Sequence, residues 1–275
     1  MISRREFLAS SALAAGAGAL RADPLGLPIG FQTFSVRDLL GKDFAGTLKR
    51  MAEAGFRTTE MCSPPGYVNA GFGSLVDMKA AEMKKTIEAA GLRCESCHYQ
   101  FKELKENLDD RIGFAKELGL KQMVVSTFGL RQDATMTDWT RAAGELNQVG
   151  ERTQKAGIQL GFHNHAFEFK ELDGVLIYDQ LMKSLDPALV KMQFQVSVIS
   201  LGYEAATFMT KYPGRFLSMH LADWSATEKK TVALGAGAVN WKKTFAAAKT
   251  GGVKNYFVEM NLDLMLPSVP YLHGL

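Results

Sequence analysis

Two hydrophobic patterns alternate along the chain after Pro24. Short apolar runs, typical of buried strands, are followed by longer stretches with apolar residues every three or four positions, typical of amphipathic helices. The predicted strands span residues 29–34, 58–61, 93–98, 122–127, 159–163, 191–196, 216–220 and 255–260. The predicted helices between them span residues 44–54, 78–90, 104–118, 137–156, 176–184, 205–211 and 241–249.

Glycine marks the end of five of these helical patterns and is followed each time by one apolar residue and a strand. The glycines are Gly55, Gly91, Gly119, Gly157 and the pair Gly251-Gly252. Glycine just past a helix end takes the left-handed backbone conformation that other residues resist, and the apolar residue packs back onto the helix. The repetition predicts a chain of strand–helix units.

Eight strands alternating with helices over about 250 residues are typical of a (β/α)8 TIM barrel. We therefore expect a single α/β domain over residues 23–275. A short tail at residues 267–275 is expected to close the ring of helices around the barrel. The alternative is an open, doubly wound sheet. That fold normally carries a glycine-rich loop after its first strand, whereas Ser35-Val36-Arg37-Asp38 stand here.

The first 22 residues form a predicted signal peptide. Ser-Arg-Arg-Glu-Phe-Leu at positions 3–8 precedes a short run of small apolar residues, and the pattern resembles the bacterial twin-arginine export signal. The run is too short and too rich in Gly and Ala to span a membrane. We expect export to the periplasm and no membrane association of the mature chain.

Charge and cysteine content exclude several functions for this chain of 275 residues. The net charge is +3, of which Arg4, Arg5 and Arg21 against Glu6 supply +2, leaving +1 for the remainder. Such a nearly neutral body predicts no binding to nucleic acid. Three cysteines do not make a disulfide scaffold, and Cys94-x-x-Cys97 lies in a predicted strand rather than at the helix start that a redox pair needs.

Polar side chains gather where the predicted strands end, which is where the active site of a barrel lies. Four of the five histidines belong to this set, which comprises Gln32, Glu60, His98, His163, His165, Glu168, Gln195, His220, Asp223 and Glu259. Carboxylate and imidazole ligands suit Mn, Co, Zn or Fe, and such an ion stabilises the enediolate formed beside a carbonyl. Taken singly, a glutamate at a strand end is most often a salt-bridge partner, and a histidine there is as often a buried core residue as a functional one.

Five ordered segments carry a resemblance to a known family. They are residues 30–38 (GFQTFSVRD), 162–169 (FHNHAFEF), 211–223, 235–241 (GAGAVNW) and 256–260 (YFVEM). Together they resemble the xylose isomerase-like TIM-barrel proteins, the sugar phosphate isomerase/epimerase superfamily that also includes endonuclease IV.

The resemblance implies a divalent metal (Mn, Co, Zn, Mg or Fe) held by Glu168, Gln195, His220 and Glu259. It also implies that Glu168 and Glu259 transfer protons, with His163 or His165 as alternatives for the fifth-strand ligand. The remaining polar strand-end residues are predicted to bind the substrate, namely Glu60, His98, His163, His165 and Asp223.

The chain departs from the family pattern at two positions. Gln195 stands where the family usually has Asp, so the metal site carries less negative charge and is expected to bind its ion less tightly. Ala222 stands where many relatives have Lys, which weakens an expectation of phosphorylated substrates.

These features predict a metal-dependent sugar isomerase or epimerase that abstracts a proton next to the carbonyl of an unphosphorylated sugar or keto-sugar. One alternative is a keto-glycoside lyase or dehydratase that uses the same enediolate, and another is a sugar-binding barrel without catalysis. DNA repair, suggested only by endonuclease IV, conflicts with the near-neutral charge. A homodimer is an open expectation.

The export signal can be tested by replacing Arg4 and Arg5 together with Lys. We expect precursor to accumulate in the cytoplasm, as measured by fractionation and immunoblotting. Continued export through the general secretory route would refute the twin-arginine assignment.

Overall fold

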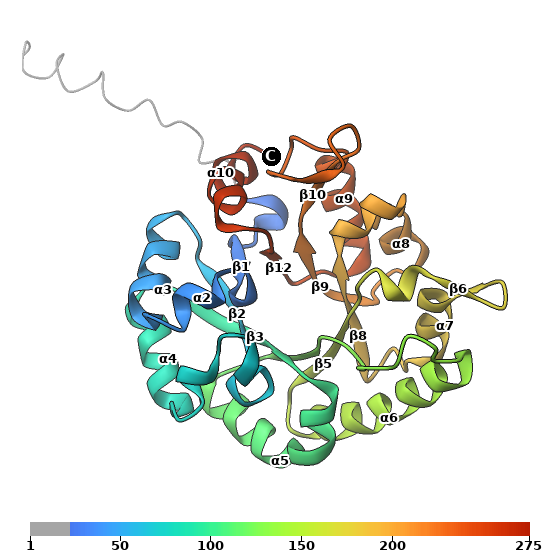
Figure 1. Ribbon diagram of the computed structural model, residues 1–275, viewed down its shortest axis with the longest axis horizontal. Helices are drawn as coiled ribbons and strands as arrows, with labels where there is room; N and C mark the ends of the chain where they lie inside the picture. Colours follow the sequence, from blue (N-terminus) through green and yellow to red (C-terminus); the bar gives the residue numbers. More distant parts are fainter. Residues whose placement is uncertain (1–22) are drawn as a thin grey trace, which may run out of the picture.

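Eight parallel strands close into a barrel that a ring of helices surrounds (Figure 1). The computed structural model describes residues 23–275, so the predicted signal peptide lies outside the described residues. Around the barrel the strands are β1 (Gly30–Gln32), β12 (Asn255–Val258), β9 (Phe216–Leu221), β8 (Val190–Gln195), β5 (Gln159–His163), β4 (Gln122–Val125), β3 (Arg93–Tyr99) and β2 (Thr58–Cys62). This closed order confirms the predicted TIM barrel and excludes the open sheet.

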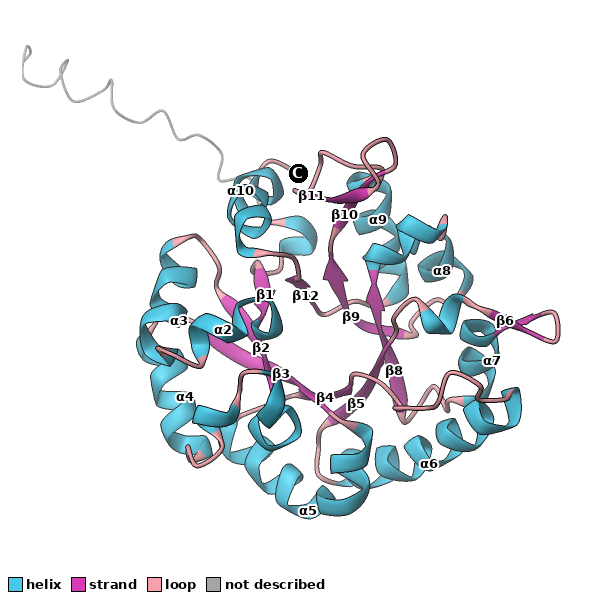
Figure 2. Ribbon diagram, in the orientation of Figure 1, coloured by secondary structure: helices cyan, strands magenta, loops and turns pink. Residues whose placement is uncertain are grey.

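Helices cover the outside of the barrel between successive strands (Figure 2). They are α2 (Arg37–Leu40), α3 (Phe44–Glu53), α4 (Ala80–Ala89), α5 (Phe101–Leu118), α6 (Met136–Lys155), α7 (Ile177–Ser184), α8 (Ala205–Lys211), α9 (Trp241–Gly251) and α10 (Leu262–His273). Each predicted helix has a counterpart at the expected place. Within residues 23–275, none of the helices has the length and apolar character that crossing a membrane requires.

The five predicted glycine stops have the backbone conformation expected of them. Gly55, Gly91, Gly119, Gly157 and Gly252 all have φ between +79° and +106°. In each case the following apolar residue is buried and its N–H bonds to a carbonyl in the last turn of the helix. In the doublet the left-handed residue is Gly252, whereas Gly251 is the last residue of α9.

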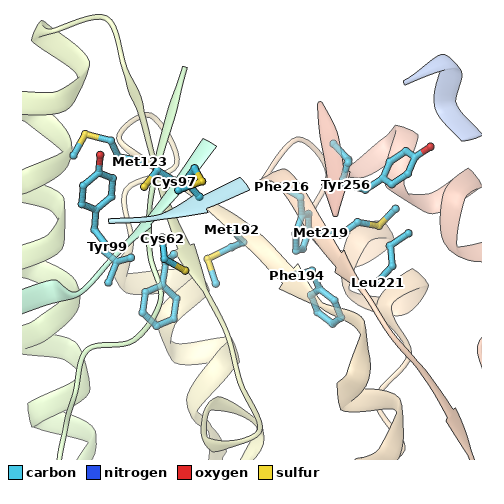
Figure 3. Packing of buried hydrophobic residues seen from close by; sticks show 14 of the residues in the cluster. Cys62, Cys97, Tyr99, Met123, Met192, Phe194, Phe216, Met219, Leu221 and Tyr256 are labelled. Atoms are coloured by element: carbon cyan, nitrogen blue, oxygen red, sulfur yellow. The ribbon is translucent and has the colours of Figure 1, made fainter. Parts of the chain in front are cut away.

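Apolar side chains fill the space between the strands and the helices (Figure 3). Phe194 and Phe216, on the neighbouring strands β8 and β9, meet edge to face with ring centroids 6.0 Å apart. Cys62 and Cys97 belong to this layer, and burial raises the pKa of both thiols well above the ordinary range. A reactive cysteine needs a lowered thiol pKa, so the structure provides no redox environment for Cys94 and Cys97.

The end of the chain differs from the expected short tail. Helix α10 begins at Leu262 and continues through Pro267 and Pro270, although proline removes a helical hydrogen bond. Met265 and Leu272 on this helix are buried against the barrel, and this tertiary packing outweighs the local preference.

Two small hairpins were also not predicted, β6 (Glu171–Leu172) with β7 (Val175–Leu176) and β10 (Asp223–Ser225) with β11 (Lys230–Val232). Their strands are too short to show a hydrophobic period.

Asp223 organises the long loop between β9 and α9. Its carboxylate is 1% exposed and accepts hydrogen bonds at 2.9–3.3 Å from four backbone N–H groups and one indole N–H, those of Trp224, Gly235, Gly237, Val239 and Trp241. The loop needs glycine at position 237, because a Cβ there would lie 2.2 Å from Asp223 Oδ1. Asp223 was predicted to bind substrate; its carboxylate is instead occupied by the loop.

Replacing Asp223 with Ala would leave several buried donors of this loop without an acceptor. We expect the free energy of unfolding to fall by about 3 kcal/mol, as measured by denaturant titration. Asp109→Ala is the control, because that side chain is 86% exposed and its ion pair with Arg152 should contribute under ~1 kcal/mol. Equal effects of the two substitutions would contradict the structural function of Asp223.

Candidate active site

The predicted strand-end residues converge at the carboxyl-terminal end of the barrel. The imidazole rings of His98, His163 and His220, from β3, β5 and β9, have centroids 4.5–5.1 Å apart. His165 lies beside His163, at 4.7 Å between ring centroids. Thus the four histidines that the sequence pattern singled out form one cluster.

His220 lies between the buried carboxylate of Glu60 and the carboxylate of Glu259, whose side chain is 20% exposed. Its Nε2 is 2.5 Å from Glu60 Oε2, and its Nδ1 is 2.9 Å from Glu259 Oε2. Burial by itself would lower the pKa of His220, but the charges of Glu259 and Glu60 outweigh it and raise that pKa to about 10. Burial likewise raises the pKa of Glu259, and His220 outweighs it and lowers that pKa to about 2. The imidazolium and both carboxylates are therefore charged at neutral pH.

Glu60 is completely buried and bonds only to side chains of the barrel. Its oxygens accept hydrogen bonds from Gln32 at 2.6 Å, Ser96 at 2.5 Å and Gln193 at 2.8 Å, besides the contact with His220 and a contact with His98 Nε2 at 3.2 Å. The sequence predicted that Glu60 binds substrate. The structure places it below the cluster, where it holds His220 in position.

The same network determines which nitrogen of His98 carries the proton. Gln193 Nε2 donates to Glu60, so Gln193 Oε1 faces His98 Nε2 at 2.6 Å. An amide oxygen only accepts, and therefore Nε2 of His98 is protonated. Burial lowers the pKa of His98, which keeps the ring neutral and Nδ1 available as an acceptor.

Gln195 reaches Glu259, as the strand register used for the metal prediction requires. Its Nε2 donates to Glu259 Oε2 at 2.6 Å, and Asn164 Oδ1 accepts from its backbone N–H at 3.2 Å. Of the four predicted metal ligands, Gln195 and His220 thus both contact Glu259.

Glu168 does not share in that contact. It lies on the 3-10 turn Phe167–Phe169 after β5, and its Oε2 accepts from the backbone N–H of His165 at 2.7 Å. Oε1 is buried without a hydrogen-bond partner among the described residues. Burial raises the pKa of Glu168 to about 7, so its protonated and ionised forms are both populated at neutral pH.

Other polar atoms on this segment are also buried without a partner. Within the part of the chain that the structure describes, they are His163 Nδ1, Asn164 Nδ2 and His165 Nδ1. An unsatisfied buried polar atom costs about 1–3 kcal/mol, so a run of them is typical of a surface that receives a ligand. We therefore regard segment 163–168 as the candidate surface for ligand contact.

The residues present fit a divalent metal by their donor chemistry. Nitrogen atoms of His98, His163 and His220 lie within 4.8 Å of one another, so these three residues could hold an ion. Glu259, in contact with His220, adds a carboxylate, and the unpartnered Nδ1 of His163 is an open ligand position. Nitrogen and oxygen donors of this kind suit first-row divalent ions.

Several polar residues of the cluster were not among the predicted site residues. Gln193 could have been predicted from the sequence, because it precedes Gln195 by two positions and so faces the same side of β8. Gln32 was noted at a strand end without a function, and Ser96 and Asn164 carried no signal in the sequence.

Comparison with known proteins agrees with this architecture. The model of the family described as "Xylose isomerase-like TIM barrel" matches residues 48–262. Inosose dehydratase of Lacticaseibacillus casei is 23% identical over 212 residues, covering 71% of this chain and 69% of that protein. Inosose dehydratase of Clostridium botulinum (strain Alaska E43 / Type E3) is 24% identical over 219 residues, with the same coverage of each chain.

A solved structure is similar over most of the chain. The sugar phosphate isomerase/epimerase from Parabacteroides distasonis ATCC 8503 superposes with a TM-score of 0.74 at 27% identity, covering 90% of this chain and 94% of that one. Since the family model spans well over half of the chain, this protein belongs to the xylose isomerase-like TIM barrel family.

Proposed function

We propose that this protein removes a proton next to the carbonyl of an unphosphorylated keto-sugar and then expels a β-substituent, as a lyase or dehydratase. The proposal rests on one observation: the carboxyls of Glu168 and Glu259 differ in their hydrogen-bond partners and in their pKa. Glu168 has an unpartnered buried oxygen and a pKa of about 7, whereas Glu259 is bonded to His220 and Gln195 and has a pKa of about 2.

Glu168 is suited to proton transfer in both directions. A general base works best with a pKa near the working pH, which burial gives to Glu168. In the first step Oε1 accepts the proton of the C–H bond and the electron pair moves to the carbonyl oxygen. In the second step the pair returns, the bond from the β-carbon to oxygen breaks, and Glu168 gives its proton to the leaving water or alcohol.

Glu259, Gln195, His220 and His163 would hold a divalent ion in this proposal. Nδ1 of His220 would exchange its proton for the ion, while Nε2 would keep its proton and its bond to Glu60. We assign the fifth-strand ligand to His163 rather than Glu168, because the His163 ring lies 4.5 Å from that of His220 and its Nδ1 has no partner. When bound, such an ion supplies Lewis-acid stabilisation of the negative charge on the carbonyl oxygen.

Elimination needs one group that first accepts and then donates a proton, and Glu168 meets that need. Two relatives named inosose dehydratase support this outcome. Isomerisation or epimerisation is the second candidate, supported by the 27% identical isomerase/epimerase structure. Epimerisation would require a second group that protonates the opposite face, and the low pKa of Glu259 makes it a poor proton donor.

An unphosphorylated substrate agrees with the polar groups of the cluster. Among the described residues, the hydrogen bonds of Glu60, Glu168 and Glu259 come from amides, imidazoles, a hydroxyl and a backbone N–H, and none comes from Lys or Arg. Phosphate groups are normally bound by Arg, which forms bidentate hydrogen bonds, or by Lys. Periplasmic location, proposed from the twin-arginine pattern, would give the enzyme unphosphorylated sugars to act on.

Glu168→Gln should abolish proton exchange, because an amide cannot accept the substrate proton. With an inosose and a 3-keto-glucoside as trial substrates in D2O, NMR should show exchange or elimination at least ~100-fold slower than in the unsubstituted protein. In the unsubstituted protein kcat/KM should rise with pH up to about 7 and then level, since the base must be ionised.

Glu171→Gln is the matched control, because Glu171 lies three residues further along and is exposed.

A stability measurement tests the raised pKa of Glu168 separately. A carboxyl whose pKa is raised in the folded state loses stability as pH rises from about 4.5 to about 7, so Glu168→Gln should become relatively more stable over that interval. Undiminished exchange in Glu168→Gln would remove Glu168 from the reaction. Absence of both exchange and metal in the unsubstituted protein would favour a sugar-binding barrel.

Gln195→Asp should raise the affinity for Mn²⁺ about tenfold or more, since an added carboxylate ligand should contribute at least ~1.4 kcal/mol. Without metal the same variant should be less stable, because Asp replaces the amide that donates to Glu259 and two carboxylates then face each other. Gln195→Leu should bind Mn²⁺ more weakly than the unsubstituted protein. Equal Mn²⁺ affinities in calorimetry for all three proteins would show that Gln195 is not a ligand.

A further inference from the structure

A cavity with both polar and apolar lining residues lies at the amino-terminal end of the barrel, opposite the candidate active site. Its volume is about 540 Å³, and residues at the beginnings of six barrel strands line it. The polar lining includes Lys121, Lys191, Lys254, Glu95, Gln122 and Asn255. Active-site residues of barrels lie at the other end, so the proposed reaction does not account for this cavity.

The three lysines are held in place by the ends of the strands. Lys121 immediately precedes β4, and its backbone N–H donates to Glu95 O at 2.8 Å. Lys254 immediately precedes β12, and its N–H donates to Leu217 O at 2.8 Å. Lys191 is the second residue of β8. The barrel therefore fixes the backbone positions of the three lysines around the cavity, while the side chains of Lys121 and Lys254 are exposed.

Positive charge exceeds negative charge in this cavity. Among residues 23–275, no carboxylate forms an ion pair with any of the three lysines, and Glu95 is the one acidic residue in the lining. Lys191 Nζ donates to the backbone oxygen of Gly214 at 2.9 Å, which leaves its charge without a counter-ion. Burial, together with the nearby Arg215, lowers the pKa of Lys191, as expected for a cation that lacks an anion.

The cavity also holds an unused acceptor. Asn255 Nδ2 donates to Gln122 Oε1 at 3.1 Å, while Asn255 Oδ1 is buried without a partner among the described residues. An amide oxygen can be satisfied only by a donor, such as a hydroxyl group. Buried Phe216 and Leu217 supply an apolar wall beside these polar groups, a combination common in small-molecule sites.

We propose that this cavity binds a small hydroxylated anion, a sugar acid or a sugar phosphate. The lysines would neutralise its carboxylate or phosphate, and a hydroxyl group of the ligand would donate to Asn255. Because the cavity is at the far end of the barrel from Glu168 and Glu259, the anion would act as a stabilising or regulatory ligand and not as the substrate.

Calorimetry with three probes tests this assignment on the mature chain. Gluconate carries a carboxylate, glucose 6-phosphate carries a phosphate, and glucose is neutral. We expect at least one of the two anions to bind and glucose to bind at least tenfold more weakly than that anion. The anion that binds identifies the head group. Failure of both anions to bind, or glucose binding as tightly as the anions, would overturn the proposal.

Charge-neutralising variants locate the binding. Replacing Lys121, Lys191 and Lys254 together with Gln should weaken anion binding at least tenfold. The control with the same net charge replaces Lys49, Lys102 and Lys230, whose side chains are 64–82% exposed, and should bind as the unsubstituted protein does. Equal weakening by both triple variants, or by neither, would overturn the assignment. Should the first triple variant fail to fold, Lys254→Gln and Asn255→Leu provide the same comparison singly, each with an expected loss of affinity.

Discussion

The charged triad of Glu60, His220 and Glu259 is the interaction on which the site depends. A carboxylate buried without a partner is very costly, and here two carboxylates share one imidazolium. The contacts join β2, β9 and the residue after β12, so removing His220 would leave two carboxylates facing each other without a cation between them. The amide and hydroxyl groups around Glu60 satisfy its remaining acceptor positions and hold the histidine at one orientation.

This triad also separates the two carboxyls that the family resemblance treats as a pair. Glu259 is bonded to His220 and Gln195 and stays ionised, which suits it to hold a cation. Glu168, outside the triad, is buried without a charged partner and keeps a pKa of about 7. This difference between the two carboxyls is the basis on which we propose elimination rather than two-sided epimerisation.

The barrel brings different chemistry to its two ends. At the carboxyl-terminal end, histidines and carboxylates pair with one another, and polar atoms on residues 163–168 have no partner among the described residues. At the amino-terminal end, three lysines surround a cavity without forming ion pairs with any described carboxylate. The fold positions both sets through the first and last residues of the same parallel strands, so a ligand at one end need not exclude a ligand at the other.

The sequence by itself determined the architecture. Hydrophobic period and the glycines at 55, 91, 119, 157 and 252 are local properties, because each depends on a few neighbouring residues. They were sufficient to predict eight strands in order, and the ends of those strands then predicted that four histidines meet. The glutamine at position 195 faces Glu259 as the predicted strand register required.

Only the tertiary structure decided what each polar residue does. Glu60 and His220 are 160 positions apart, and no local pattern states that one lies beneath the other. Asp223 is occupied by a loop that returns to it, and α10 continues through two prolines because the barrel covers its apolar side chains. The pKa of Glu168 likewise depends on burial by residues from elsewhere in the chain. Burial, pairing and charge compensation arise from contacts between distant segments, and these exist only once the barrel has closed.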